Sequence, residues 1–387
     1  MAATITSRPL FDSEHEQFRD AVRTFMAREI LPNLERWDEQ HLVDRSAWLA
    51  AGKQGLLGIA VPEQYGGGDV SDYRFRAVMA EEFARISAAS VSSGFTVHDD
   101  VFVPYLVELG TPEQKRRWLP RCCSGEAIGA IAMTEPGAGS DLRGITTTAV
   151  RDGDTWVLNG SKTFITNGIQ ADYVIVVAYT DVDAGAKGIS LLMVERGMQG
   201  FTRGRKLKKI GLQAQDTAEL FFDDVRVPAA NLLGVAGGGF AHLMDRLPLE
   251  RLSIAVGACA AAQAAFEWTV DYVRTRQAFG KPIAAQQNTQ FVLAEIATEV
   301  DVTLSYVDQM ILKCNQGTLS AVDAAKVKLW ATEAQTRIVD RCLQLFGGYG
   351  YMLEFPIARS FVDSRVQTIY GGTSEIMKLI IGRGLGL

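Results

Sequence analysis

The hydrophobic positions of roughly the first 120 residues recur at helical spacing. The run Ser13–Glu16 (SEHE) has the form of a capping box, which predicts a helix start at Ser13. Thr111 and Pro112 form a second start signal, a capping residue followed by proline at the first helical position. We therefore expect a helical amino-terminal domain over residues 1–120. Its first helix shows apolar side chains at intervals of one, three and four residues: Phe18, Val22, Phe25 and Met26.

Residues 121–235 change to short β-rich runs separated by turns. Asn159-Gly160 lies between two of these runs and is a strong hairpin signal. Several short strands at this spacing predict a small barrel or sandwich as a middle domain. The expected strands cover residues 127–134, 155–158, 163–166, 172–179, 189–194 and 218–222.

Residues 236–387 return to helical patterning, with long alanine-rich segments near 240–275, 284–314 and 320–345. Three or four long helices separated by short breaks predict an up-down bundle as the carboxy-terminal domain. The expected breaks lie at Gly280-Lys281-Pro282, Gln316-Gly317, Gly347-Gly348 and Gly371-Gly372.

Composition narrows the class of protein. Hydrophobic residues make up 47% and charged residues 22%, which is typical of a globular protein and excludes disorder. With 39 basic and 45 acidic residues the net charge is −6, which argues against nucleic-acid binding. No apolar run reaches the roughly 18 residues of a membrane span, and the first residues lack the apolar core of a signal peptide.

The cysteines and histidines indicate the compartment and the absence of metal chemistry. There are 5 cysteines, an odd number with no CxxC pair, which favours reduced thiols and a cytoplasmic location. Only 4 histidines are present, so we expect no metal site. The α–β–α order contains no strand–GxGxxG–helix unit and no Walker loop, so a nucleotide cofactor would be held in some other way.

Two local motifs could carry chemistry. Met133–Asp141 (MTEPGAGSD) follows an expected strand; it is either an ordinary loop or one whose hydroxyls and amides contact an anion or a flavin ring. Glu250 follows Pro248, which should kink or restart a helix, and precedes an apolar segment. Its carboxyl is either a general base with a perturbed pKa or one half of an ion pair with a neighbouring arginine.

Further motifs contain glycine or clustered basic residues. Residues 274–281 (RTRQAFGK) place cations at a helix end, where they bind a phosphate or complement the helix dipole. Residues 344–350 (QLFGGYG) and 370–375 (YGGTSE) are helix termini that could also meet a ligand. The basic run from Arg203 to Lys209 is either a solvated strand edge or a docking patch for phosphates or an acidic protein.

Taken in order, these motifs resemble the acyl-CoA dehydrogenase family over essentially the whole chain. The most specific markers are residues 133–141, 159–168 (NGSKTFITNG), 274–283 (RTRQAFGKPI), 344–351 (QLFGGYGY) and 369–378 (IYGGTSEIMK). The stretches 204–225 and 247–252 (LPLERL) are most similar to the long-chain branch. The resemblance implies an α+β multidomain fold: an amino-terminal helical domain, a middle β-barrel and a carboxy-terminal four-helix bundle.

The resemblance also implies a cofactor, FAD, held between barrel and bundle in a homodimer or homotetramer. In the subunit's own site FAD would contact Ile131, Met133, Thr134, Gly139, Ser140, Phe164, Ile165, Thr166, Thr373, Ser374 and Glu375. FAD of the neighbouring subunit would contact Arg276, Phe279, Gln286, Gln287, Gln344, Gly347 and Gly348. The acyl thioester would contact Ser140, Arg251, Gly371 and Gly372.

The sequence departs from the commonest family pattern at Gly371, where many members have the glutamate that acts as catalytic base. The long-chain and isovaleryl branches place this base in a bundle-helix motif like LER, and Glu250 fills that position. Phe164 stands where many relatives have tryptophan, and the long-chain branch shares the phenylalanine. The resemblance thus implies that Glu250 takes the Cα proton and that flavin N5 accepts the hydride from Cβ.

We therefore expect an FAD-dependent dehydrogenase that converts a medium- or long-chain acyl thioester to the trans-2-enoyl product, with an electron-transfer flavoprotein as acceptor. Small residues such as Ser93 and Val97 leave room for a long chain. Asp99 and Asp100 either cap the next helix or face the acyl pocket. Three alternatives remain: a dehydrogenase of acyl carrier proteins with altered regiochemistry, an oxygen-using flavin enzyme, and a non-catalytic binding protein.

Overall fold

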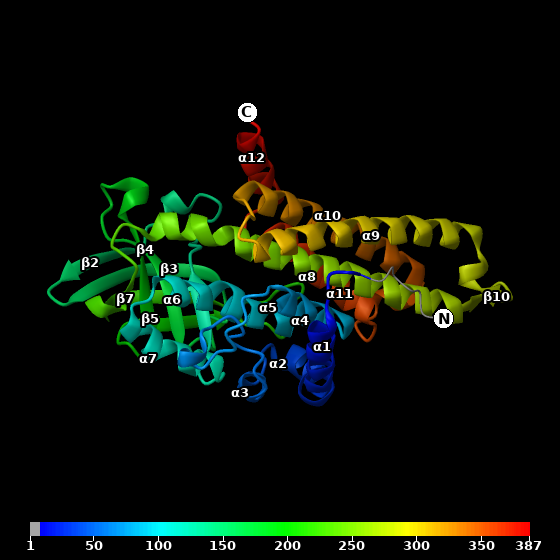
Figure 1. The fold of residues 1–387 in the computed structure, drawn as a ribbon, viewed down its shortest axis with the longest axis horizontal. Helices are drawn as coiled ribbons and strands as arrows, with labels where there is room; N and C mark the ends of the chain where they lie inside the picture. The colour runs from blue at the N-terminus through cyan, green and yellow to red at the C-terminus, as the bar shows by residue number, and fades with distance from the viewer. Residues whose placement is uncertain (1–7) are drawn as a thin grey trace.

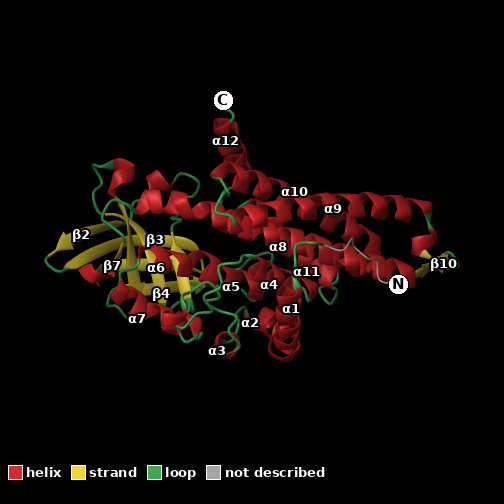
Figure 2. Ribbon diagram, in the orientation of Figure 1, coloured by secondary structure: helices red, strands yellow, loops and turns green. Residues whose placement is uncertain are grey.

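Three parts with different secondary structure lie along an elongated molecule (Figure 1). The structure is a computed structural model and describes residues 8–387. A β-sheet occupies one end, the long carboxy-terminal helices run toward the other, and the amino-terminal helices pack along one side (Figure 2). The order helical, β, helical agrees with the expectation from the sequence.

The amino-terminal part is helical, and its first helix begins at the expected residue. Ser13 opens that helix, but Asp12 is the N-cap and His15 completes the capping box, so the cap lies one residue before the predicted one. A π-helical segment (Met26–Ile30) and a 3-10 turn that contains Pro32 (Leu31–Asn33) connect α1 directly to α2. The helices are α1 (Ser13–Phe25), α2 (Leu34–Gln40), α3 (Arg45–Lys53), α4 (Arg74–Arg85), α5 (Ala89–Thr96), α6 (Val103–Leu109) and α7 (Pro112–Cys123).

The middle part is one eight-stranded sheet with the order β6-β7-β3-β2-β4-β5-β8, with β1 paired parallel to β4. Its alternate faces bury apolar side chains, and β4 and most of β5 are buried along their whole length. No pairing among the described residues joins β6 to β8, so strand hydrogen bonds do not close a barrel. The strands are β1 (Gly129–Ala132), β2 (Thr148–Asp152), β3 (Thr155–Thr166), β4 (Tyr173–Tyr179), β5 (Ile189–Glu195), β6 (Phe201–Lys206), β7 (Thr217–Pro228) and β8 (Leu232–Leu233).

The hairpin predicted at Asn159-Gly160 is wrong. The two runs form one strand, β3, whose pairing with β7 shifts register between Leu158 and Gly160. Gly160 has φ of 146°, and a Cβ there would lie 2.5 Å from the Thr147 hydroxyl. Asn159 exchanges two hydrogen bonds with Asp224 on β7, at 2.9 and 2.8 Å. Two residue steps on β3 stand against three on β7, so the extra residue of this β-bulge lies on β7 at Asp223-Asp224, opposite Asn159 in a continuous strand.

The carboxy-terminal part contains the three long helices that the sequence predicts. They are α8 (Gly239–Thr275), α9 (Gln287–Asn315) and α10 (Ala321–Phe346). A short hairpin of β9 (Gln277–Ala278) and β10 (Lys281–Pro282) links α8 to α9. Helices α11 (Pro356–Ser364) and α12 (Ser374–Gly384) complete this part, and α12 projects away from the long axis (Figure 1).

Helix α8 connects the two ends of the molecule. It continues through Pro248 without a break and passes from the sheet end to the β9–β10 hairpin (Figure 1). Its apolar face packs against α9 and α10 in a core that includes Val256, Ala262 and Ile338. Within residues 8–387, no helix combines the length and apolar character that a membrane crossing requires.

Candidate functional site

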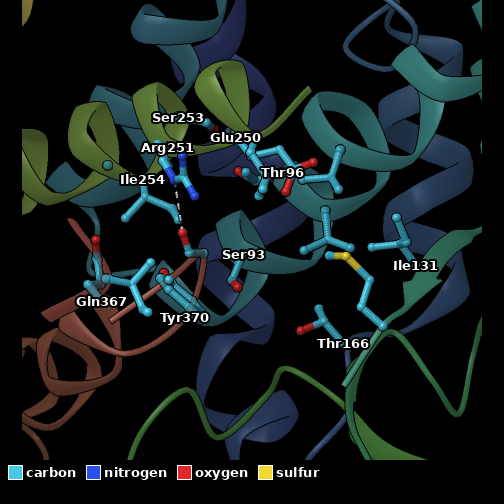
Figure 3. A pocket seen from close by; sticks show the side chains of 18 of the residues that line it. Ser93, Thr96, Ile131, Thr166, Glu250, Arg251, Ser253, Ile254, Gln367 and Tyr370 are labelled. Atoms are coloured by element: carbon cyan, nitrogen blue, oxygen red, sulfur yellow. Dashed lines mark hydrogen bonds between the residues drawn. The ribbon is translucent and has the colours of Figure 1, made fainter. Parts of the chain in front are cut away.

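A cavity of about 840 Å³ lies where the sheet, the amino-terminal helices and the bundle meet. One wall comes from β1, the loop after it and the end of β3; the other comes from α8 and the Gly371-Gly372 turn (Figure 3). The cavity brings together ten of the residues that the sequence predicts for the site: Ile131, Met133, Thr134, Gly139, Ser140, Thr166, Glu250, Arg251, Gly371 and Gly372.

Glu250 is buried in this cavity, on α8, two residues after Pro248. Burial raises the pKa of its carboxyl to about 7, because the charged form loses its hydration. The Tyr105 hydroxyl, on α6, donates a hydrogen bond to Glu250 Oε1 at 3.2 Å and opposes this rise. The alternative of a simple ion pair does not hold among the described residues, since no salt bridge to Glu250 forms within 4.0 Å. A carboxyl with a pKa near neutrality can accept a proton at physiological pH.

The Gly371-Gly372 turn lies against α8, in the same wall of the cavity as Glu250, and is held by two cations. Both glycines have positive φ, 63° and 100°, which side chains rarely adopt. Arg251 Nε donates to the Gly371 carbonyl at 3.3 Å (Figure 3), and Lys328 Nζ donates to the Gly372 carbonyl at 2.6 Å. Burial and repulsion by Arg251 lower the pKa of Lys328 to about 8. Sequence reasoning missed Lys328; a lysine on the apolar face of a long helix was the available signal.

A buried ion pair between Lys162 and Glu135 fixes the loop after β1. Lys162 Nζ lies 2.8 Å from Glu135 Oε1 and donates to the Met133 carbonyl at 3.0 Å. The same carboxylate accepts hydrogen bonds from the Thr146 and Thr147 amides, at 2.6 and 3.0 Å. Burial lowers the pKa of Lys162 to about 8, while these donors hold the pKa of Glu135 at about 2 against the cost of burial. Both groups are therefore charged at neutral pH.

The residues around this loop suit a flavin ring. Apolar side chains of Ile131 and Met133 offer a surface for its face, and hydroxyls of Thr134 and Ser140 offer donors for its polar edge. Gln215 Nε2 donates to Thr166 Oγ1 at 2.7 Å, which leaves the Thr166 hydroxyl hydrogen free to point into the cavity.

Other predicted contacts of the flavin lie around the cavity but do not line it. Phe164 is 68% exposed and has φ of 59°, a strained conformation for an aromatic residue that typically marks a functional position. Ile165, its neighbour on β3, points instead into the core of the sheet. Thr373, Ser374 and Glu375 begin α12, and Thr373 caps that helix by accepting from the Ile376 amide.

The second predicted group of cofactor contacts lies at the far end of α8. A shallow hollow there is lined by Arg276, Gln344, Gly347 and Gly348, and the Arg276 guanidinium stacks 5.4 Å from the Tyr349 ring. Phe279, on the nearby hairpin, is 96% exposed. Gln286 and Gln287 follow at the start of α9. Arg276 is separated from Glu250 by 26 residues of one helix, about 39 Å, so one subunit's two groups cannot meet the same FAD molecule.

Four residues were considered in the sequence as neighbours of the acyl chain, and the structure places two of them in the cavity and two outside it. Ser93 and Val97 line the cavity as expected. Asp99 and Asp100 neither cap a helix nor line the cavity, so both expectations were wrong. They lie in a π-helical segment, Val97–Phe102, where both pair with the Arg76 guanidinium. Asp100 also accepts a hydrogen bond of 2.6 Å from the Ser253 hydroxyl, which lines the cavity.

The basic run 203–209 starts on the edge strand β6 and continues beyond it. Arg203 donates to the carbonyls of Gly168 and Ala171, at 2.9 and 2.8 Å. Lys206 and Lys209 donate to backbone carbonyls of Gln40 and Gln215. These contacts favour the strand-edge interpretation over a docking patch.

Comparison with known proteins gives consistent matches along the chain. Family models described as acyl-CoA dehydrogenase, amino-terminal, middle and carboxy-terminal domain match residues 12–126, 130–225 and 237–386. A relative from Sus scrofa, long-chain specific acyl-CoA dehydrogenase, mitochondrial, is 50% identical over 380 residues, which cover 97% of this chain and 87% of the relative.

Solved structures match the fold equally well. An acyl-CoA dehydrogenase from Geobacillus kaustophilus superposes with a TM-score of 0.94 at 47% identity, covering 100% of both chains. A glutaryl-CoA dehydrogenase from Mycobacterium smegmatis in complex with FADH2 gives 0.91 at 31% identity, covering 97% and 95%. A structure described as an electron transferring flavoprotein of Acidaminococcus fermentans gives 0.93 at 33% identity, covering 98% and 99%.

Proposed function

The chain belongs to the acyl-CoA dehydrogenase family, whose members are FAD-dependent oxidoreductases, and from this premise we propose that it converts medium- or long-chain acyl-CoA to trans-2-enoyl-CoA. The observation that supports this reaction is the Glu250 carboxyl, buried in a cavity whose opposite wall carries the residues suited to a flavin. Its pKa of about 7 suits a general base.

Glu250 would remove the proton from Cα of the acyl chain. A saturated thioester holds this proton firmly, so the base must be strong and correctly placed. Entry of the acyl chain removes the remaining water around the carboxylate and makes it more basic. FAD, held against the loop after β1, would supply the hydride acceptor that no side chain of the chain provides.

The Gly371-Gly372 turn would stabilise the charge that develops on the thioester oxygen. The backbone N–H of Gly371 is the donor that the family resemblance implies, and a backbone donor needs no side chain. Arg251 and Lys328 fix the two carbonyls of the turn, which supports a preorganised orientation of its peptide groups. Preorganised donors cost no rearrangement during the reaction.

The shape of the cavity supports a long acyl chain. Its wall on α8 continues from Glu250 through Ile254, Gly257 and Ala261. The eleven helical steps from Glu250 to Ala261 rise about 16 Å along the helix, the length of roughly a dozen extended carbon–carbon bonds. The facing residues are small: Ala80, Ala84, Ser87, Ala89, Ser92 and Ser93.

The far end of α8 supports a homodimer or homotetramer in which each subunit contributes to its neighbour's FAD site. Exposed apolar side chains gather around the hollow there, among them Phe279, Tyr351 and Leu353. Arg276 would pair with the phosphates of that FAD. The family resemblance points to an electron-transfer flavoprotein as acceptor, and the cytoplasmic location remains a prediction from the cysteine pattern.

Anaerobic titration of the FAD-loaded protein tests the proposal. Straight-chain acyl-CoAs from C4 to C20 are added in turn, and the bleaching rate of the flavin absorbance is measured with the enoyl product identified by mass spectrometry. We expect the highest kcat/KM at C8 or beyond. An optimum at C4–C5 with no turnover of longer chains would contradict the assignment of substrate.

Two further arms separate the alternatives. Acyl carrier protein thioesters of the same chain length should react more slowly than the CoA thioesters. Peroxide release in air without another acceptor should be slow, since fast release indicates an oxygen-using enzyme. A flavin that no thioester bleaches would indicate a binding protein.

A further inference from the structure

Two glutamine side chains in the cavity have amide oxygens without a hydrogen-bond partner among residues 8–387. They are Gln335, on α10, and Gln367, in the 3-10 turn Arg365–Thr368, and both line the cavity. Gln335 is 1% exposed, and both amide oxygens are shielded from solvent. Buried side-chain oxygens in native proteins nearly always have a partner, so a partner from outside the chain is indicated.

The position of Gln335 along the cavity follows from the packing of α10 on α8. The two helices run parallel, and each α10 residue lies beside the α8 residue about 74 positions earlier. Tyr272 and Phe346 stack at 4.1 Å, and Ile254 and Lys328 both approach the position of Gly371. Gln335 is therefore level with Ala261, about 16 Å beyond Glu250 along α8. Gln367 lies three residues before Tyr370, and Figure 3 shows both on the other side of the cavity from Ile131 and Thr166.

A saturated hydrocarbon chain cannot satisfy these amides. Much of the surrounding wall is apolar, from Ile254 and Ala261 to Trp268. No donor among residues 8–387 reaches either amide oxygen, so the polar groups of the cavity do not supply the missing partner. An amide can turn to present either its oxygen or its NH2 group, and a hydroxyl suits both orientations because it donates and accepts.

We propose that the distal half of the cavity recognises a hydroxyl group carried by the acyl chain, with Gln335 and Gln367 as its specificity-determining residues. The inference rests on the proposed function, because it concerns the acyl chain of that same reaction. The depth of Gln335 places the hydroxyl roughly ten to fourteen carbons from the thioester. A site built to bond a substrate hydroxyl rejects the analogue that lacks it, because the amides are then left unpaired.

The test compares hexadecanoyl-CoA with its hydroxylated isomers, substituted singly from C8 to C15, in the wild-type protein and in Gln335→Leu and Gln367→Leu. We expect one or two adjacent isomers to exceed hexadecanoyl-CoA in kcat/KM by at least tenfold. Gln335→Leu should abolish this preference and raise the rate with hexadecanoyl-CoA. Gln263→Leu is the matched control, since Gln263 also has an unpartnered buried oxygen but lies outside the cavity-lining set.

Equal rates with all isomers in the wild type, or an unchanged preference in both leucine variants, would overturn the proposal and leave water as the partner of the amides. Efficient turnover of hexadecanoyl-CoA in that case leaves the proposed function intact. If no thioester reacts, the proposed function fails, and calorimetric binding of 3-thia-acyl-CoA with and without the hydroxyl still decides the inference. Gln335→Met replaces Gln335→Leu if the latter does not fold.

Discussion

The Tyr105 hydroxyl donates a hydrogen bond to the Glu250 carboxylate across 3.2 Å, although 145 residues separate them in the chain. Burial and the neighbouring carboxylate raise the pKa of Tyr105 well above its usual value, so the phenol stays protonated and remains a donor. This bond stabilises the charged form of Glu250 and keeps its pKa from rising further.

Tyr105→Phe should therefore shift the pH dependence of the reaction. In the wild type, flavin reduction should increase as pH rises through about 7, where Glu250 loses its proton. Without the phenol the pKa of Glu250 is higher, so this increase should move upward by about one pH unit. Stopped-flow reduction at a series of pH values measures the shift. Tyr306→Phe, on α9 and outside the residues that line the cavity or the hollow, is the control, and an unshifted profile in Tyr105→Phe would show that the phenol does not tune the base.

Glu250→Gln should retain FAD and bind acyl-CoA but reduce the flavin about 10²–10⁴-fold more slowly, because the amide cannot accept the Cα proton. Asp245→Asn removes a carboxylate at an exposed position of the same helix and should leave the rate unchanged. Stopped-flow absorbance with a saturating acyl-CoA measures both. Reduction at a near-normal rate in Glu250→Gln would place the base elsewhere.

Moving the base to position 371 should fail without a second change. A Cβ on Gly371 would lie 2.4 Å from Ile254 Cδ1, and its φ of 63° disfavours any side chain. Glu250→Gly with Gly371→Glu should therefore remain inactive, and adding Ile254→Ala should restore measurable flavin reduction. Ile254→Ala alone serves as the control for the enlarged cavity. Full recovery without the Ile254 change would show that the turn is more adaptable than its contacts indicate.

Arg276→Ala should weaken FAD retention and subunit association together, since the guanidinium is proposed to reach the neighbour's cofactor. Arg274→Ala, two residues earlier on α8, removes the same charge and should have little effect on either property. FAD content by absorbance and molar mass by analytical ultracentrifugation measure the two quantities. An FAD-saturated monomer would contradict the shared site.

Lys162→Met should destabilise the loop that holds the predicted flavin contacts. The variant leaves the Glu135 carboxylate buried without its cation, a change that costs about 3 kcal/mol. Urea denaturation should show a lower free energy of unfolding, and the dissociation constant of FAD should rise. Adding Glu135→Gln removes the unpaired charge, so the double variant should be more stable than Lys162→Met. A double variant that is less stable than Lys162→Met would show that the other hydrogen bonds of Glu135 dominate.

The long helices were predictable because their apolar faces repeat over many turns, as in 240–275. Asn159-Gly160 was misread because this pair occurs both in hairpin turns and, as here, opposite a bulge in the neighbouring strand, and only the pairing with β7 distinguishes the two. Glu250 and the glycine turns were found through family motifs. Tyr105 and Gln335 were not found, since a buried phenol or amide is common and its meaning depends on neighbours distant in sequence.

Helix α8 sets the distance between the cavity around Glu250 and the hollow around Arg276. With the roles proposed for Glu250 and Arg276, its length sets how far one active centre lies from the contact made to the next subunit. Inserting or deleting a single residue between them would turn one end by about 100° relative to the other and shift it by about 1.5 Å. Insertions and deletions should therefore be tolerated far less in this segment than in the surface loops. The length of α8 fixes the distance between the base in one subunit and the contact that this subunit makes to its neighbour's cofactor.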